Sequence, residues 1–128
     1  MHDDRGGRIF RQAWIDGVNA HYPNGNPKDS YIAPWDNIPE WERAAAEAVY
    51  QQLAQFITLS DGNTSYLTRD QKSQWVALCW IPQIHKHIAD PKPGYVAPWD
   101  KLPDWQKEVD ADIFEAIERA VATEAPTD

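Results

Sequence analysis

The chain has 128 residues, of which 42% are hydrophobic and 25% are charged, a composition that suits one compact soluble domain. The formal net charge of −8 is shared equally by the two halves of the chain, which argues against a basic surface that binds nucleic acid. No apolar stretch approaches the roughly 20 residues that a membrane-spanning helix needs.

The first predicted element is a helix that contains residues 9–18. Its apolar residues recur at spacings of three and four, which is typical of one face of a helix: Ile9, Phe10, Ala13, Trp14 and Val18. The next segment, HYPNGNPKDS at residues 21–30, is rich in Pro, Gly, Asn and Asp and predicts a loop. About seven residues before this helix are expected to be frayed.

The segment YIAPWDNIPEWE at residues 31–42 predicts a turn that leads directly into a second helix. Pro34 holds the approach extended, and Asp36 is expected to accept backbone N–H bonds within the turn. Pro39 has a fixed φ and lacks an N–H group, which suits the start of a helix. An apolar stripe then runs from Trp41 to Ile57, so this helix is predicted to be amphipathic.

Residues 60–67 predict a linker, after which the same organisation returns. Thr68-x-x-Gln71 resembles a capping box at the start of a third helix, and Pro82 is expected to end or kink that helix. The loop IADPKPG precedes a second turn, YVAPWDKLPDWQ at residues 95–106, and a fourth helix follows. Residues 123–128 are predicted to form a disordered tail.

These elements form an internal repeat, which fixes the architecture. Seven of twelve positions are identical between residues 31–42 and residues 95–106, at a spacing of 64. Upstream, Trp14-Ile15-x-x-Val18-x-x-His21 matches Trp80-Ile81-x-x-Ile84-x-x-His87 at a spacing of 66. We therefore predict an all-α protein of two tandem helix–loop–helix repeats, residues 1–59 and 68–122, packed as one pseudo-twofold four-helix domain.

Each predicted turn is bracketed by two tryptophans, Trp35 and Trp41 in the first repeat and Trp99 and Trp105 in the second. One interpretation is structural: the rings fill the gap between two helices and fasten the turn to them. The other is functional: one ring of each pair stays exposed and builds an aromatic-walled pocket. The residues alone leave both interpretations open.

His21 and His87 also recur at matching positions. Each either bonds to a carbonyl at its helix end or pairs with the turn aspartate of its own repeat, His21 with Asp36 and His87 with Asp100. His85 and His87 face apart on a helix, and no Cys, His and Asp cluster has the spacing of metal ligands. No metal site is therefore predicted.

Motifs of catalytic chemistry are missing from the sequence, which has no Gly-rich phosphate loop, no GxSxG and no HExxH. The single cysteine, Cys79, lies in an apolar run, which predicts a buried, inert thiol and fits a reducing cytoplasm. The segment MHDDRGGR lacks the apolar core of a signal peptide. We therefore expect a cytoplasmic protein that is not an enzyme and needs no cofactor.

The two turns resemble the repeat named after ryanodine receptors, the RyR domain, and similar small bacterial and phage proteins. The shared pattern is Trp-[Asp/Glu]-x-[Leu/Ala]-Pro-[Glu/Asp]-Trp-[Gln/Glu], which the chain approaches at residues 35–42 and 99–106. The clear similarity covers each turn and the helix after it, which is under half of the chain. The resemblance implies a mainly helical module, often duplicated into a pseudo-twofold pair, that acts in ligand sensing or interaction rather than catalysis.

We expect a binding module that recognises a small ligand or a protein segment in an aromatic-lined groove between the two repeats. The candidate binding residues are Trp35, Asp36, Trp41, Trp99, Asp100, Trp105, His21 and His87. An alternative is an acidic inhibitor, of the kind that phages encode, that blocks a basic site on a host protein. A structural adaptor that dimerises is a third possibility. We expect a protein or small-ligand partner, a monomer or a homodimer, and neither direct nucleic-acid binding nor a membrane.

Overall fold

The computed structural model describes residues 4–124, which contain four α-helices and no β-strand. The first repeat supplies α1 (Arg5–His21) and α2 (Glu40–Leu59), and the second supplies α3 (Arg69–His87) and α4 (Asp104–Glu124). Short 3₁₀ turns lie in the connections between them. The prediction of an all-α domain with two helices in each repeat is therefore confirmed.

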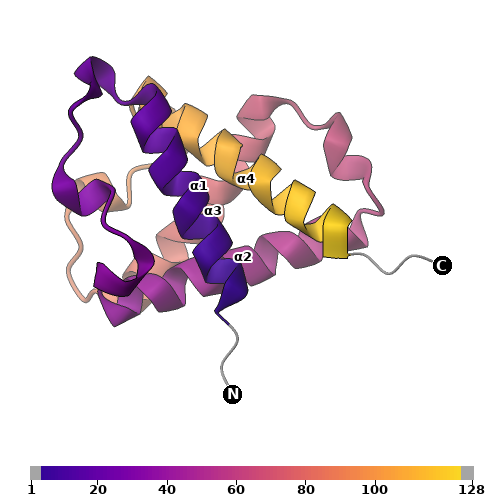
Figure 1. Cartoon of the computed structure of the whole chain (residues 1–128), viewed down its shortest axis with the longest axis horizontal. Coiled ribbons are helices and arrows are strands. Elements are labelled where there is room, and N and C mark those ends of the chain that lie inside the picture. The colour runs from indigo at the N-terminus through magenta and orange to yellow at the C-terminus, as the bar shows by residue number, and fades with distance from the viewer. Residues whose placement is uncertain (1–3, 125–128) are drawn as a thin grey trace.

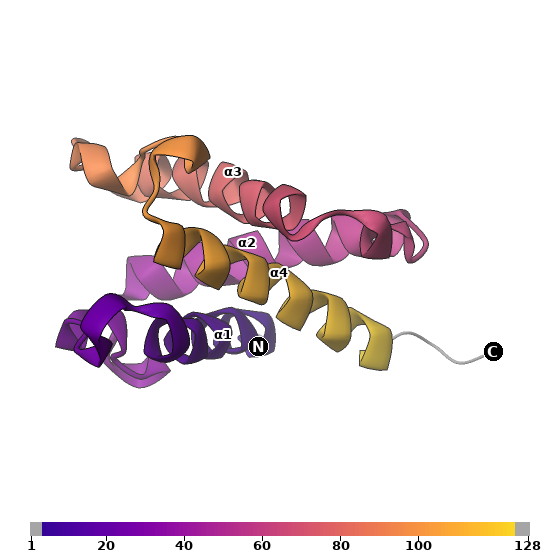
Figure 2. The same cartoon turned by 90° about the horizontal axis from the view of Figure 1, so that it is seen from above.

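The helices of the two repeats are interleaved. Viewed from above, α2 and α4 lie in the middle of the molecule, with α1 on one side and α3 on the other (Figure 2). Helix α1 packs against both α2 and α4, and α3 likewise packs against both α4 and α2. Exchanging the two repeats therefore preserves these contacts, which is the signature of a pseudo-twofold arrangement. The two long connections, residues 22–39 and 88–103, lie at the same end of the molecule (Figure 1).

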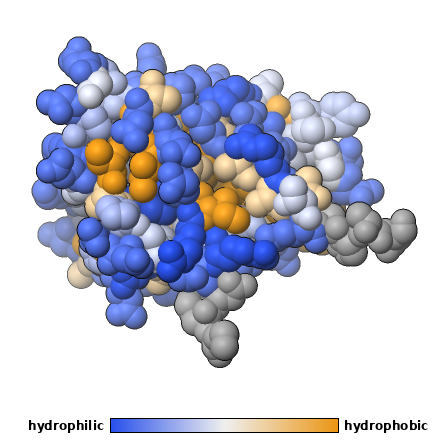
Figure 3. Space-filling view, in the orientation of Figure 1, coloured by the Kyte–Doolittle hydropathy of each residue, from blue (hydrophilic) through white to orange (hydrophobic). Residues whose placement is uncertain are grey.

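The hydrophobic core sits between the two central helices. The apolar stripes predicted for α2 and α4 supply most of its fully buried side chains, namely Val49, Leu53, Val109, Ile113, Phe114 and Ile117. Val18 from α1 and Val76 from α3 complete it from the two sides. Both repeats contribute to one continuous core, so neither buries its apolar face alone. The face seen in Figure 3 is mainly hydrophilic, with small apolar clusters, and none of the described helices is both long and apolar enough to cross a membrane.

The start of α3 is the capping box predicted from its sequence. The Gln71 N–H donates to the Thr68 hydroxyl over 3.1 Å, and the Thr68 N–H donates to the Gln71 side-chain oxygen over 2.9 Å. Helix α3 then runs through Pro82 to His87, so of the two predicted effects of this proline, an end or a kink, the helix end is excluded. The residues after Pro82 remain helical because Ile84, on the same turn, is buried in the protein interior.

Two predictions about the ends of the chain need correction. Helix α1 begins at Arg5, and Gly6 and Gly7 are buried, so the expected fraying does not extend to residue 7. Helix α4 continues to Glu124, which includes the first two residues of the predicted tail. Residues 1–3 and 125–128 lie outside the described residues.

The repeated turn is a short 3₁₀ helix that backbone hydrogen bonds hold together. The Asn37 N–H donates to the Pro34 carbonyl, and the Lys101 N–H donates to the Pro98 carbonyl, each over 2.9 Å. The predicted bonds from the backbone to the Asp36 side chain are not formed, because the carboxyl points to solvent and lies 3.7 Å from Arg8. The Asp100 carboxyl likewise accepts no hydrogen bond from the described residues.

Gly7 allows the first turn to approach α1 closely. A Cβ atom at this position would lie only 2.5 Å from Cη2 of Trp35 and 3.2 Å from the backbone nitrogen of Glu47. The Gly7 N–H also donates to the Glu47 carboxylate over 3.2 Å. In the second repeat the corresponding residue is Ser73, which contacts the matching tryptophan through its hydroxyl. The same contact between helix and turn is thus made in two chemically different ways.

We expect Gly7→Ala to lower the free energy of unfolding by about 1–3 kcal/mol, because the added methyl forces the Trp35 ring away from α1. Chemical denaturation followed by circular dichroism measures this change. Gly94→Ala is the control, since a Cβ atom there meets nothing within 4 Å. If Gly7→Ala, Gly94→Ala and the unmodified protein had the same free energy of unfolding, the close contact between position 7 and the Trp35 ring would be contradicted.

Candidate functional site

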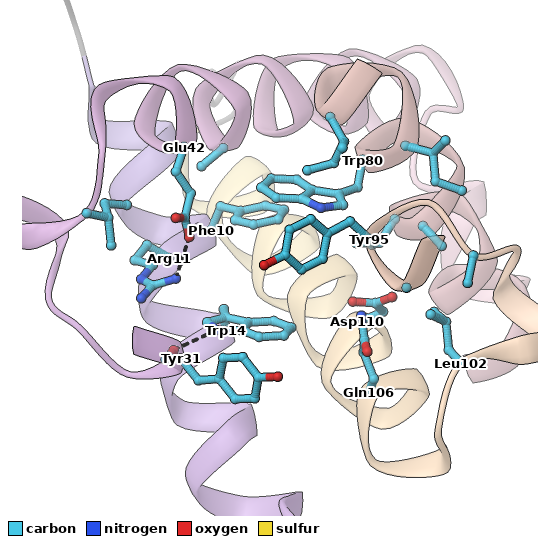
Figure 4. Close-up of a pocket in the computed structure, with 18 of the residues that line it drawn as sticks. Phe10, Arg11, Trp14, Tyr31, Glu42, Trp80, Tyr95, Leu102, Gln106 and Asp110 are labelled. Atoms are coloured by element: carbon cyan, nitrogen blue, oxygen red, sulfur yellow. Dashed lines mark hydrogen bonds and ion pairs between the residues drawn. The ribbon is translucent and has the colours of Figure 1, made fainter. Parts of the chain in front are cut away.

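A cavity of about 420 Å³ lies between the two repeats, at the end of the molecule where the long connections meet (Figure 4). All four helices contribute to its walls, and so do the turns at residues 30–31 and 94–97. Ser30, Gly94 and Tyr95 line the cavity and are exposed, so its mouth lies between these two turns. The cavity is therefore a property of the paired repeats and not of either one.

Most of the lining residues occur as repeat-related pairs. Trp14 and Trp80 line the cavity at a spacing of 66, and three further aromatic or apolar pairs do so at a spacing of 64: Tyr31 with Tyr95, Ile38 with Leu102, and Trp41 with Trp105. Matching positions of the two repeats thus face the same space. This arrangement places the cavity at the pseudo-twofold axis.

The aromatic walls are fixed by contacts with one another. The Trp105 ring packs edge-on against Tyr22, with the ring centroids 4.9 Å apart. The Trp14 ring is anchored by a 2.7 Å hydrogen bond from its indole N–H to the Tyr31 carbonyl. On the opposite wall the Trp80 ring stacks on Phe10 at 5.6 Å. Because these rings have partners within the protein, the cavity is preformed.

The polar residues of the cavity break the symmetry of the repeat. Arg11 and Glu42 of the first repeat correspond to Ala77 and Gln106 of the second. Conversely, Asp110 of the second repeat corresponds to an alanine, Ala46, in the first. Ionisable side chains therefore occupy different positions in the two halves of an otherwise similar site.

In the first half, the charges of Arg11 and Glu42 compensate each other. The Arg11 guanidinium lies 3.0 Å from the Glu42 carboxylate and also donates to the carbonyls of Ala33 and Ser30. Burial lowers the pKa of Arg11 and raises that of Glu42, while their mutual attraction opposes both shifts. This pair attaches the connection between α1 and α2 to the cavity wall. Most of the N–H donors of Arg11 are occupied by these hydrogen bonds.

In the second half, Asp110 stands without a partner. Only 6% of the residue is exposed, and its carboxyl group faces the cavity from α4 (Figure 4). No hydrogen bond or ion pair from residues 4–124 reaches this carboxyl group. Burial therefore raises the pKa of Asp110 well above its usual range. Asp110 is a buried acid whose charged form the protein itself does not stabilise.

The tryptophans predicted as candidate binding residues divide into two groups. Trp41 and Trp105 line the cavity. Trp35 and Trp99 instead fasten the turns to the helices: the Arg8 guanidinium lies 5.6 Å from the Trp35 ring, and the Trp99 indole N–H donates to the Ser73 hydroxyl over 2.6 Å. Each pair thus contains one ring in a structural position and one at the cavity.

The predicted pairing of His21 with Asp36 is wrong. His21 Nε2 lies 2.9 Å from a carboxylate oxygen of Asp112 on α4, because α1 packs directly along α4. His87 makes no bond to Asp100; its Nε2 is buried without a hydrogen-bond partner, and its ring lies 6.3 Å from Trp41. Neither histidine nor the two turn aspartates, Asp36 and Asp100, lines the cavity.

The described part of the chain holds no cluster of metal ligands. No group of three His, Cys, Asp or Glu side chains among residues 4–124 is arranged to hold a metal ion. Cys79 is half-buried, and burial raises the pKa of its thiol, which disfavours the reactive thiolate. The arrangement around the cavity is suited to binding through shape, aromatic contact and one acid.

Arg11, Glu42 and Asp110 were not among the residues predicted from the sequence. The prediction rested on positions that are identical in the two repeats, whereas these three residues differ between them. A signal was nevertheless present: Asp110 interrupts an apolar helix face at a position where the first repeat has Ala46. A charged residue beside the apolar face of a helix, where the related repeat has an alanine, indicates either a paired ion or a binding site when it is buried.

No protein-family model matches this chain, and no curated protein or solved structure matches it either. The geometry and chemistry of the cavity are therefore the basis on which a function is proposed.

We expect Asp110→Asn to stabilise the protein at neutral and alkaline pH. The raised pKa means that stability falls as the pH rises from the unfolded-state pKa of about 4 through the folded-state pKa, since the folded protein must then bury a charge. Removing that charge should increase the free energy of unfolding by about 1–3 kcal/mol at high pH. Near pH 4, where both side chains are neutral, the gain should vanish.

Thermal and urea denaturation across this pH range measures the difference between the variant and the unmodified protein. Asp112→Asn serves as the control, since Asp112 bonds to Arg69 over 3.0 Å and to His21. This control should destabilise the protein by about 0.5–1 kcal/mol. A gain from Asp110→Asn that does not change with pH would contradict a buried, unpaired carboxyl group.

Proposed function

We propose that the protein is a non-enzymatic binding module whose two repeats enclose a small organic ligand. The observation that carries this proposal is the preformed, aromatic-walled cavity of about 420 Å³ at the pseudo-twofold axis. Its volume falls within the roughly 300–1,000 Å³ of small-molecule sites, which are mostly apolar with a few convergent polar groups. Clefts between packed units are also where such sites tend to form.

The lining supports a ligand that contains a ring. Seven large aromatic side chains, four from the first repeat and three from the second, line the cavity: Phe10, Trp14, Tyr31, Trp41, Trp80, Tyr95 and Trp105. Flat aromatic surfaces favour stacked or edge-on contact with another ring. Because most of these side chains are already held by protein contacts, little conformational freedom is lost when a ligand binds.

Tyr95 differs from the other aromatic residues. It is 53% exposed, whereas its repeat counterpart Tyr31 packs against Tyr22, Trp14 and Trp105. It stands at the mouth of the cavity, at the end of the short 3₁₀ turn Pro93–Tyr95 in the connection between α3 and α4 (Figure 4). Tyr95 is therefore the side chain best placed to close over a bound ligand.

The alternative of an acidic inhibitor has less support. Four acids form a row along α4, but Arg69 bonds to Glu108, Asp112 and Glu115 over 2.7–3.0 Å. Lys72 adds bonds to Glu115 and Glu118 over 3.2 and 2.8 Å. Each acid of this row thus has an ion-pair partner within the protein, whereas mimicry of a polyanion requires unpaired carboxylates on an exposed face. The RyR-like assignment remains a prediction and is compatible with a ligand-binding module.

Two series of simple probes test the proposal. The phenyl series is 2-phenylethylammonium, 2-phenylethanol and 3-phenylpropanoate, and the indole series is tryptamine, tryptophol and indole-3-propanoate. Ligand-detected NMR with the full-length protein should reveal binding by at least one probe, with a Kd of about 1 mM for molecules of this size. Protein-detected NMR should place the largest shift changes at the cavity tryptophans.

Matched alanine variants locate the binding. Ala46 is buried and lines the cavity, while Ala44 is exposed on the same helix, so Ala46→Leu should block the probes and Ala44→Leu should not. If Ala46→Leu does not fold, Ala97→Trp is the second cavity-filling variant, because Ala97 lines the cavity from the connection between α3 and α4. Binding that persists in a folded cavity-filling variant, or binding by none of the six probes, overturns the proposed function.

A further inference from the structure

We propose that the cavity is specific for an organic cation, a ring-bearing amine whose ammonium group binds the Asp110 carboxylate. The inference rests on the proposed function and names the chemical class of its ligand. It is carried by the position of Asp110, a buried acid that faces the cavity, together with the aromatic side chains around it.

The first argument is the missing partner of Asp110. Buried ionisable groups are normally paired or hydrogen-bonded, because burial of an isolated charge is strongly unfavourable. Asp110 has neither kind of partner among residues 4–124, and only 6% of the residue is exposed to solvent. An ammonium group of a ligand would supply both the opposite charge and the hydrogen-bond donors. The side chain therefore has the chemistry of one half of an ion pair.

The second argument is the charge around the cavity. The lining residues from α1 and α2 bring one base and one acid, Arg11 and Glu42, which compensate each other over 3.0 Å. The α3 wall brings no ionisable side chain, and the two connections bring only the neutral phenols of Tyr31 and Tyr95. Asp110 is thus the one lining acid without an opposite charge, so a cation is favoured over an anion.

The third argument is the surroundings of the acid. In Figure 4 Asp110 and Gln106 lie on α4 and face the Tyr95 and Trp80 side of the cavity, away from the Arg11–Glu42 pair. An ammonium group beside Asp110 therefore comes within reach of aromatic faces, which attract cations. The neutral amide of Gln106 replaces the Glu42 of the first repeat and adds a hydrogen-bonding group without a charge.

Ligand binding should displace a proton. Burial raises the pKa of Asp110, so without a cation the carboxyl group keeps its proton to a higher pH than an exposed aspartate does. When the ammonium binds, this proton leaves for solvent and an ion pair of carboxylate and ammonium remains. Affinity should therefore increase with pH up to the point where the amine itself loses its charge. The other ionisable side chains that line the cavity, namely Arg11, Glu42, Tyr31 and Tyr95, are present in both states.

The experiment compares the charged and uncharged members of each probe series by titration calorimetry and NMR. The amines should bind about tenfold or more tightly than the matching alcohols, and the carboxylates should bind most weakly. In Asp110→Asn the ratio of amine affinity to alcohol affinity should fall to about one, because the amine loses its ion pair while the alcohol still binds. Asp112→Asn, a change on the same helix outside the cavity, should leave the preference unchanged.

Calorimetry in two buffers of different ionisation enthalpy measures the released proton directly. The unmodified protein should release a proton when an amine binds, and Asp110→Asn should not. Equal affinity of amines and alcohols overturns this inference but leaves the proposed function standing. A preference for amines that survives in Asp110→Asn overturns the role of the carboxylate.

A further probe separates a free amine from a lysine side chain of a protein partner. Nα-acetyl-lysine methylamide carries the same ammonium group on an aliphatic chain without a ring. It should bind more weakly than tryptamine, because it lacks the ring that stacks on the cavity walls. Tighter binding by the lysine probe would contradict the ring-bearing amine as the ligand.

Discussion

The packing of each repeat's first helix against the second helices of both repeats is the constraint on which the rest of the structure depends. Because α1 lies on α2 and α4 together, and α3 does the same from the other side, neither repeat has a core of its own. The two long connections must then meet at one end of the molecule, as Figure 1 shows. The cavity is the space that remains between these connections where the paired helices diverge. Its existence follows from the duplication.

The repeated tryptophan turn explains how two short units achieve this packing. Trp35 and Trp99 attach each turn to the first helix of its own repeat, through the close approach at Gly7 in one case and the Ser73 hydroxyl in the other. Trp41 and Trp105, six residues later, are carried into the first turn of α2 and α4 and reach the cavity. One short sequence thus positions both a structural ring and a ring of the site. The structural interpretation describes Trp35 and Trp99, and the functional interpretation of Trp41 and Trp105 stays a prediction.

Much of the fold was predictable because it depends on local patterns. Helix periodicity, the Thr68–Gln71 capping box and the duplication are all local or repeated signals, and the structure contains each of them. The contacts between repeats were not predictable in this way. His21 pairs with Asp112, which is 91 residues away, instead of the nearer Asp36, because the interleaved packing brings α1 alongside α4. Nor could the local sequence decide whether Pro82 ends α3 or only kinks it, and in the structure the helix continues to His87.

The differences between the repeats carry more information about function than their similarities. Identical positions, such as the two tryptophan turns, are constrained by a structural task that both repeats share. At Ala46 and Asp110 the structural task is the same, yet one repeat has a small apolar residue and the other a buried acid. Ala46 shows that the fold does not need an acid at this position, and an unpaired buried carboxyl group destabilises a folded protein. A destabilising residue at a site that tolerates alanine is best explained by a task that the fold alone does not impose. We propose that this task is the recognition of a positive charge in the cavity.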